Sequence, residues 1–217
     1  MNVGLSLADQ IRLELRADII GGRLLPGMPL VENELAGSYN ASRNTIREAL
    51  HCLGQEGLTR YVRHKGVMVR RLERDDLRDL FRVRRTLELQ AIASARPLRE
   101  CQSGHMLDAI EAAELARDRE DWRAVGTHGL VFHQHVVALL DSPLLDEFFT
   151  NVVAQLRLVF CTAPDEALFQ APWLERDRQI HGWLADGDTA SAGTAMACYL
   201  DDSERLLLNM FDPSLRH

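Results

Sequence analysis

The feature that most constrains the fold is a helix pattern over residues 43–55, which follows a capping serine. Ser42 can accept a backbone hydrogen bond at a helix N-terminus, and Gly57 can end the helix. Apolar residues at i, i+3, i+4 and i+7 place one helix face against a core; they are Ile46, Ala49, Leu50 and Leu53. A shorter predicted helix, 32–39, precedes it across a tight turn. The two segments predict a helix-turn-helix.

Segments on both sides complete a small domain. Apolar residues recur every four positions over residues 6–20 and predict a first helix; they are Leu7, Ile11, Leu15 and Ile19. After the third helix, two β-prone runs, 58–63 and 67–70, flank a turn formed by His64, Lys65 and Gly66. Three helices and a hairpin predict a winged helix-turn-helix over residues 1–72, with the only lysine of the chain at the wing tip.

The residues at the start of the predicted third helix suit base recognition. Arg43, Asn44 and Arg47 lie off the apolar face, at the end of the helix that reaches base edges in such motifs. Arginine can pair with guanine and asparagine with adenine, each contributing about 1–3 kcal/mol of discrimination. A basic wing tip can reach phosphates or the minor groove. The pattern favours DNA binding over a protein-interaction module whose basic residues only face water.

Charge is divided unevenly along the chain. Residues 1–72 hold ten Arg and Lys and seven Asp and Glu, a net of +3. Residues 73–217 hold fifteen basic and twenty-five acidic residues, a net of −10, and the two parts together give the −7 of the whole chain. This asymmetry indicates that the first part meets a polyanion.

The remaining composition points to an ordinary intracellular protein. The chain has no apolar run of about 18 residues and no signal-peptide pattern at its start, so we expect no membrane association. The four cysteines are widely spaced without a CxxC motif and fit reduced thiols. We therefore expect a cytoplasmic location.

Residues 7–69 resemble the DNA-binding domain of the GntR family along their whole length. The matching positions are Leu24, Pro26, Gly27, Leu30, Glu32, Leu35, Ala36, Ser42, Arg43, Ile46, Arg47, Glu48, Ala49, Leu50, Leu53, Glu56, Gly57 and Leu58. The resemblance implies a set of DNA contacts on the helices and on the wing: Asn33, Ser42, Arg43, Asn44, Thr45, Arg47, His64, Lys65 and Gly66. Asn33 stands where arginine is common in the family.

From Glu73 onward the sequence has no β-rich run and predicts helices throughout. Breaks at 141–143, 162–165 and 186–188 separate them. Six helices are predicted, over residues 75–96, 102–119, 122–140, 144–160, 172–185 and 189–209. The fold class is therefore mainly α: a winged helix-turn-helix followed by an antiparallel helical bundle over residues 73–217.

This second part resembles the FCD domain of the FadR subgroup of GntR regulators. The supporting residues are Leu80 to Arg84, Leu87, Glu88, Phe132, His133, Ser142 to Leu145, Gly187 and Asp188. The resemblance implies an effector-binding and dimerisation domain, hence a homodimer. Many such domains hold a divalent metal with an Asp or Asn and three His, but the corresponding residues here are Gly129, His133, Asp177 and Tyr199. We therefore expect neither a metal nor another cofactor, although His128, His135 or His181 could rebuild a rearranged site.

A polar pocket inside the bundle remains an expectation without metal. Arg84 lies where relatives face a ligand cavity, and the predicted effector-binding residues are Arg84, His133, Asp177, His181 and Tyr199. A buried arginine needs a carboxylate partner, and either Asp177 or Glu88 could supply it. A small organic acid is the expected effector because guanidinium groups match carboxylates.

These features predict a sequence-specific transcription regulator, a repressor whose dimer reads a short pseudo-palindrome and responds to a metabolite. One alternative is a DNA-binding protein whose helical domain only dimerises. Another is an enzyme using the His and Asp residues of that domain. The chain has no GxSxG, HExxH or P-loop pattern, so we do not expect an enzyme.

Overall fold

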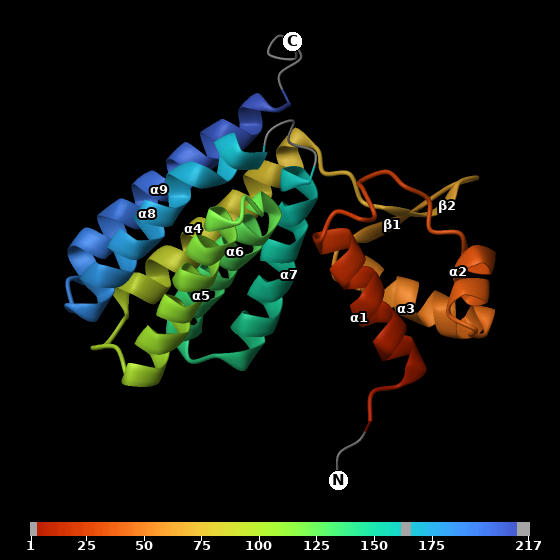
Figure 1. The fold of residues 1–217 in the computed structure, drawn as a ribbon, viewed down its shortest axis with the longest axis horizontal. Coiled ribbons are helices and arrows are strands. Elements are labelled where there is room, and N and C mark those ends of the chain that lie inside the picture. Colours follow the sequence, from red (N-terminus) through yellow and green to blue (C-terminus); the bar gives the residue numbers. More distant parts are fainter. Residues whose placement is uncertain (1–3, 162–165, 212–217) are drawn as a thin grey trace. The chain divides into compact units, whose positions relative to one another are not determined.

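A computed structural model describes residues 4–161 and 166–211. The chain divides into two compact units, Met1–Leu72 and Glu73–His217. Helices dominate both, and a two-stranded antiparallel sheet is the only sheet of the described residues (Figure 1). The predicted mainly α fold is confirmed. In this described part of the chain no helix is long and apolar enough to cross a membrane.

The first unit contains three helices and a hairpin, as predicted. Its elements are α1 (Leu7–Ile20), α2 (Glu32–Ser38), α3 (Arg43–Gln55), β1 (Thr59–Val62) and β2 (Gly66–Val69). The Ser6 and Ser42 side chains cap α1 and α3 by accepting from the backbone N–H groups of Asp9 and Thr45. These caps fix where the two helices begin, because each satisfies a backbone donor that the helix leaves unpaired.

The core of this unit lies between α1 and α3, which pack together. Its fully buried members come from the two apolar faces and from the hairpin: Ile11, Leu15, Ile19, Ile46, Ala49, Leu53, Leu58 and Val69. At one edge, Arg12 and Arg16 of α1 donate to the Glu56 carboxylate at 2.6 and 2.9 Å. These contacts hold the C-terminal end of α3 against α1.

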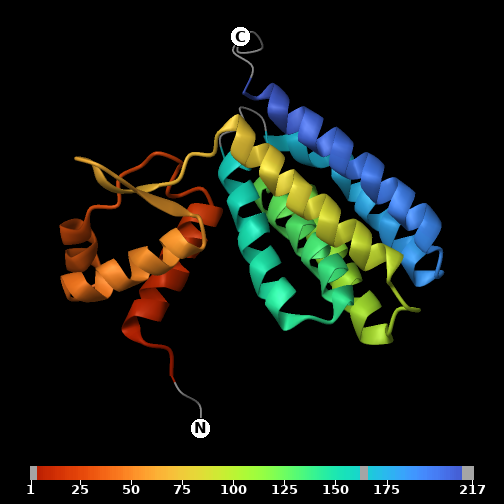
Figure 2. The same ribbon diagram turned by 180° about the vertical axis from the view of Figure 1, so that it is seen from behind.

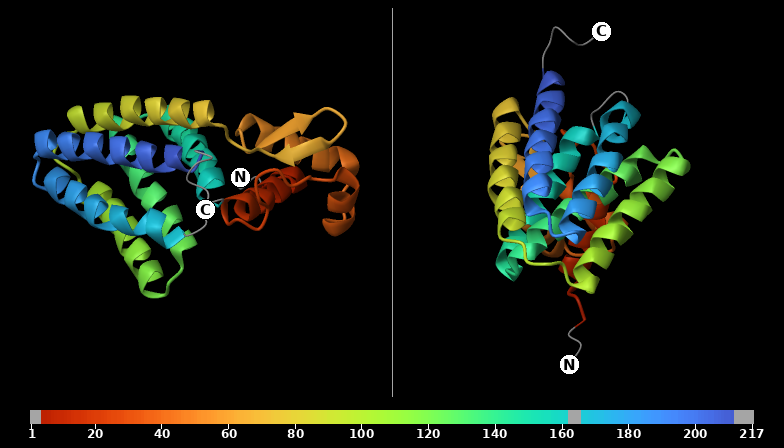
Figure 3. Two further views of the ribbon diagram at one scale, coloured as in Figure 1. Left: turned by 90° about the horizontal axis from the view of Figure 1, so that it is seen from above. Right: turned by 90° about the vertical axis from the view of Figure 1, so that its left-hand side faces the viewer.

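The second unit is a bundle of six helices among the described residues. They are α4 (Arg74–Ala93), α5 (Glu100–Asp118), α6 (Trp122–Val137), α7 (Pro143–Phe160), α8 (Glu166–Ala185) and α9 (Thr189–Asn209). Figures 2 and 3 show them lying alongside one another. Helix α6 packs against α4, α5, α7 and α8 and is the centre of the unit. Side chains from α6 therefore meet those of several helices.

Several predicted boundaries were wrong. Helix α4 ends at Ala93 rather than at residue 96, and α5 begins at Glu100 rather than at residue 102. Helix α8 begins at Glu166 rather than at residue 172, and Pro172 lies inside it. Proline is common at the start of a helix. Here α8 extends to both sides of Pro172, and Gln170 and Leu174 on either side of it are buried in the bundle. The predicted third helix of the bundle ends as α-helix at Val137 and continues as one 3-10 turn, η1 (Ala138–Leu140). A break predicted at 162–165 lies outside the described residues.

Candidate nucleic-acid interface and ligand cavity

The N-terminal end of α3 presents a group of polar side chains to solvent. Arg43, Asn44 and Arg47 are all exposed, while Ile46 between them is completely buried. The buried face fixes the helix against the core, so the three side chains project from a firm support. They can donate to base edges or phosphates without any change in the fold.

Two other predicted contact residues have a structural role as well. The Ser42 hydroxyl accepts from the Thr45 backbone N–H at 3.1 Å and is bonded to the Thr45 hydroxyl at 2.8 Å. Ser42 is exposed, Thr45 is half-buried, and Asn33 is exposed on α2. The hydroxyls of Ser42 and Thr45 therefore help to hold the first turn of α3, in addition to any contact with a phosphate.

The wing tip forms a tight turn between β1 and β2, in which Val62 pairs with Gly66. The tip residues His64 and Lys65 are exposed. Gly66 has a φ of 82°, a left-handed conformation that side chains rarely adopt. The hairpin register therefore depends on this glycine, which leaves Lys65 projecting from the tip.

A contact between the two helices of the helix-turn-helix was not predicted. The Arg47 Nε atom donates to Glu32 Oε2 at 2.7 Å, which joins α3 to α2. Both residues line a groove of about 500 Å³, together with Leu50, His51, Gly54, Gln55, Thr59, Arg60, Tyr61 and Val67. Fifteen residues separate the two partners, so only the folded motif brings them together.

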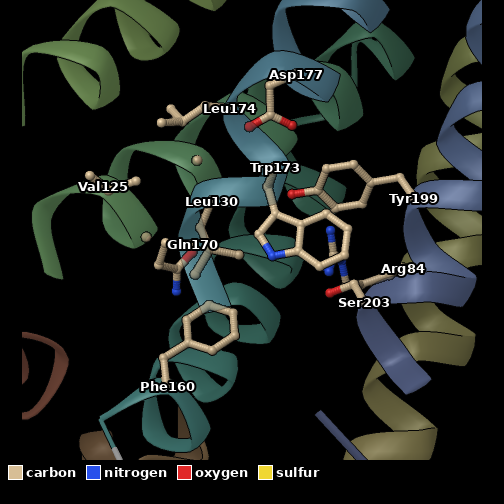
Figure 4. A pocket seen from close by; sticks show the side chains of 12 residues that line it. Arg84, Val125, Leu130, Phe160, Gln170, Trp173, Leu174, Asp177, Tyr199 and Ser203 are labelled. Atoms are coloured by element: carbon tan, nitrogen blue, oxygen red, sulfur yellow. The ribbon is translucent and has the colours of Figure 1, made fainter. Parts of the chain in front are cut away.

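The second unit contains a small cavity between α4, α6, α7, α8 and α9. Its lining includes Arg84 of α4, Gly129 of α6, Trp173 and Asp177 of α8 and Tyr199 of α9 (Figure 4). Its volume is about 20 Å³, which is room for about one water molecule. A ligand larger than water would therefore have to displace lining side chains.

Three buried polar side chains form a network behind this cavity. Glu88 accepts from Arg84 Nε at 2.7 Å and from His133 Nδ1 at 2.6 Å. Burial raises the pKa of Glu88, but the charge of Arg84 and the hydrogen bonds from Arg84 and His133 outweigh this effect, so the pKa lies below its usual value. Burial lowers the pKa of His133, so the imidazole ring is neutral. Because the Glu88 carboxylate can only accept a hydrogen bond, the ring proton lies on Nδ1 and Nε2 carries none. Of the two partners left open for Arg84, the structure shows Glu88.

Asp177 and Tyr199 form a second pair beside this network. The two side chains are hydrogen-bonded, and burial raises the pKa of each well above its ordinary value. Asp177 Oδ1 lies 3.8 Å from His133 Nε2, and the rings of His133 and Tyr199 are 4.8 Å apart. Arg84 Nη2, His133 Nε2 and Asp177 Oδ1 are buried without a hydrogen-bond partner among the described residues. The cavity can therefore both donate to and accept from a ligand.

The five predicted effector-binding residues do not all meet at this cavity. Arg84, Asp177 and Tyr199 line it, and His133 lies directly behind Asp177. His181 is outside the lining, and its Nε2 is bonded to the Ser103 hydroxyl at 3.0 Å. His181 lies one turn beyond Asp177 on α8, but its side chain contacts α5 instead of the cavity.

Other cavity residues were missed by sequence reasoning. Gln170 and Trp173 line the cavity from α8 and Ser203 from α9. A Cβ atom added at Gly126 would lie 2.6 Å from Gln170 Nε2 and 2.7 Å from Arg157 Nη1, so the glycine makes room for both. Gln170 lies in the first turns of α8, which the sequence did not predict to be helical. Without that helix there was no pattern to place its side chain in the bundle.

The metal-binding pattern of related domains does not fit these residues. Gly129 supplies no side chain, and Tyr199 has a phenol in place of an imidazole. In the described part of the chain, no group of three or more His, Cys, Asp or Glu side chains could hold a metal ion. His133 and Asp177 alone do not make the four-ligand set, which needs several donors that converge on one point.

Comparisons with known proteins match both units. The family model described as "Bacterial regulatory proteins, gntR family" matches residues 7–69, and that of the FCD domain matches residues 79–202. An HTH-type transcriptional regulator of an unstable DNA locus in Streptomyces ambofaciens is 30% identical over 90% of this chain and 84% of its own.

Two further comparisons agree with these matches. The transcriptional repressor RspR of Escherichia coli K12 is 25% identical over 89% of this chain and 85% of its own. The crystal structure of a GntR transcriptional regulator from Rhodococcus sp. RHA1 has a TM-score of 0.90 and 31% identity, and it covers 94% of this chain and 99% of its own.

Proposed function

The chain belongs to the GntR family and is a DNA-binding transcription regulator with an FCD domain, and we propose that it acts as a dimeric, metabolite-responsive repressor. Its whole-length relatives are regulators and not enzymes. The observation that supports DNA reading is the exposed group Arg43, Asn44 and Arg47 at the start of the second helix of the helix-turn-helix. A repressor acts on the chromosome, which supports a cytoplasmic location.

The proposed DNA contacts lie on α2, at the start of α3 and at the wing tip. Arg43, Asn44 and Arg47 read bases, Ser42 and Thr45 bind the backbone, and the wing residues His64 to Gly66 reach phosphates or the minor groove. Asn33 adds a shorter, uncharged contact from α2. A single reading helix covers only a few base pairs, so we infer that two copies read a pseudo-palindromic operator.

The proposed effector site is the cavity lined by Arg84, Asp177 and Tyr199, with His133 behind it. A small organic acid suits it because Arg84 Nη2 is a buried donor without a partner among the described residues. Since the cavity holds only about 20 Å³, binding must move a side chain such as Trp173 or Gln170. By moving such a side chain, the bound acid can favour one conformation of the protein over another.

The experiment that tests DNA reading is fluorescence anisotropy with duplex DNA from upstream of the gene for this chain. We expect saturable binding that Arg43→Ala weakens by about 1–3 kcal/mol. Arg23→Ala is the matched control, because Arg23 is 70% exposed and ion-paired with Asp18 outside the reading helix. Equal affinities of wild type and Arg43→Ala for every duplex would contradict the role assigned to α3.

The effector proposal is tested by melting temperature in the presence of a panel of small carboxylic acids. An acid that binds the folded state raises the melting temperature and should lower DNA affinity in the same concentration range. If no acid shifts the melting temperature while sedimentation shows a dimer, the helical domain only dimerises. A monomer at concentrations that saturate the operator would contradict the dimer.

A further inference from the structure

The ion pair between Glu32 and Arg47 constrains a side chain that faces the partner. It joins the first residue of α2 to α3 at 2.7 Å. Arg47 is 60% exposed and Glu32 31% exposed, so the pair lies at the surface where DNA is proposed to bind. A surface ion pair contributes little to stability, and its position calls for another explanation.

The geometry of the contact leaves the reading end of the guanidinium open. Glu32 accepts from Nε, which is on the side of the guanidinium group. Both Nη groups remain at the end, and among the described residues Arg47 makes no other ion pair. Bidentate recognition of guanine uses two parallel N–H donors of this kind.

The groove beside Arg47 explains why the side chain needs a tether. It measures about 500 Å³, and Arg47, Leu50 and Val67 are among its lining residues. Arginine has many rotamers of similar energy, so an untethered side chain could turn into the groove and away from DNA. The carboxylate of Glu32 selects one direction.

We propose that Glu32 is a specificity-determining residue that holds Arg47 in position to read a guanine in the major groove. This inference rests on the proposed function in one respect, that Arg47 contacts DNA. Glu32 also places a negative charge close to the phosphates, which weakens binding to every sequence. It therefore lowers non-specific affinity while it sharpens the choice of one base pair.

The test begins with full-length wild-type protein and a pool of random-sequence duplexes, from which the preferred sequence is selected. Arg47→Ala then identifies the base pair that Arg47 reads, as the position where preference falls by about 5- to 150-fold. Glu32→Ala should lose preference at that same base pair, while its affinity for unrelated duplexes rises. The double variant should discriminate no worse than Arg47→Ala alone, because the two residues act as one unit.

Glu34→Ala is the matched control. Glu34 lies in the same first turn of α2, is exposed, and in the described part of the chain makes no ion pair. It removes the same charge from the same helix, so it should raise non-specific affinity equally and keep the guanine preference. Melting temperatures of the two variants show whether either is unfolded, and Glu32→Gln provides a second variant of similar size if Glu32→Ala is.

Each alternative result is distinguishable. A Glu32→Ala protein that keeps its guanine preference within about twofold overturns the inference. If Arg47→Ala keeps every preference while Arg43→Ala loses one, then Arg47 reads no base; the inference fails and the proposed function stands. If wild type selects no sequence from the pool, the proposed function and the inference fail together.

Discussion

The two units use arginine in opposite ways. In the first unit, Arg43 and Arg47 are exposed at the start of α3. In the second, Arg84 and Arg157 are each 1% exposed and pair with the carboxylates of Glu88 and Glu166 at 2.7 and 3.2 Å. An exposed cation is screened by solvent and contributes little to stability, whereas a buried one must have a partner. We therefore expect exposed arginines to serve DNA binding in the first unit, whereas the buried arginines of the second unit are held by carboxylate partners.

The division of net charge has the same meaning. The first 72 residues carry +3 and the remainder −10. We therefore expect attraction to DNA to come from the first unit, and the net negative charge of the second unit to oppose non-specific binding. Substitutions in the two units should consequently differ in kind: those in the first alter DNA affinity, and those in the second alter stability.

The largest effect is expected from breaking the buried pair in the second unit. Glu88→Gln leaves the Arg84 charge buried without a carboxylate and should reduce the free energy of unfolding by about 3–5 kcal/mol. Urea unfolding followed by tryptophan fluorescence measures this, because Trp122, Trp173 and Trp183 all lie in the second unit.

The control for this substitution is an exposed pair of the same unit. Asp201 is 67% exposed and pairs with Arg85, so Asp201→Asn should cost no more than about 1 kcal/mol. If Glu88→Gln costs as little as Asp201→Asn, the contrast between buried and exposed charge is wrong.

A pH-dependent effect is expected at Asp177. Burial raises its pKa well above 3.8, so the folded state holds this proton more tightly than the unfolded state does. Its contribution to stability is complete below about pH 3.8 and is lost as the pH rises toward the folded-state pKa. Asparagine mimics the protonated form, so Asp177→Asn should be more stable than wild type at pH 8.

The difference between Asp177→Asn and wild type should shrink as the pH falls toward 4. Urea unfolding of both proteins from pH 4 to 8 measures the difference. A constant difference across this range would mean that Asp177 does not change its protonation on unfolding.

Two glycines one turn apart on α6 separate cavity packing from helix propensity. Alanine in a helix is more stable than glycine by about 0.5–1 kcal/mol. At Gly129 the nearest atom to an added Cβ is Asp177 Oδ2 at 3.6 Å, an ordinary contact, so Gly129→Ala should gain this amount. At Gly126 the buried ends of Gln170 and Arg157 lie under 3 Å away, so Gly126→Ala should lose about 1–3 kcal/mol. Equal melting temperatures of the two variants would show that Gln170 and Arg157 move freely.

Local signals in the sequence predicted much of the fold because the forces behind them are local. Ser6 and Ser42 are caps as expected, and α3 and α9 have the predicted bounds. Each depends on residues within one or two turns. Helix α8 was predicted to start too late, because a proline usually marks a start and the packing of Gln170 that overrides it is tertiary.

The candidate sites were predictable to different degrees for the same reason. The exposed face of α3 follows from the apolar period of its other face, and this inference does not require knowledge of any distant contact. Arg47 pairs with Glu32 of another helix, which the sequence did not predict. Arg84 pairs with Glu88 one turn along α4, but the sequence left this choice open because Asp177 was also a candidate. The position of His181 against Ser103 likewise reflects how α5 and α8 pack together.

The smallest effect is expected at the wing tip. Lys65→Ala removes one exposed positive charge from the first unit and should lower the slope of log affinity against log salt by about one, with stability unchanged. Anisotropy titrations over a salt series measure the slope. Arg78→Ala removes the same charge from the surface of the second unit, where Arg78 pairs with Asp75, and should leave the slope as it is. Equal slopes for both variants would mean that Lys65 makes no phosphate contact.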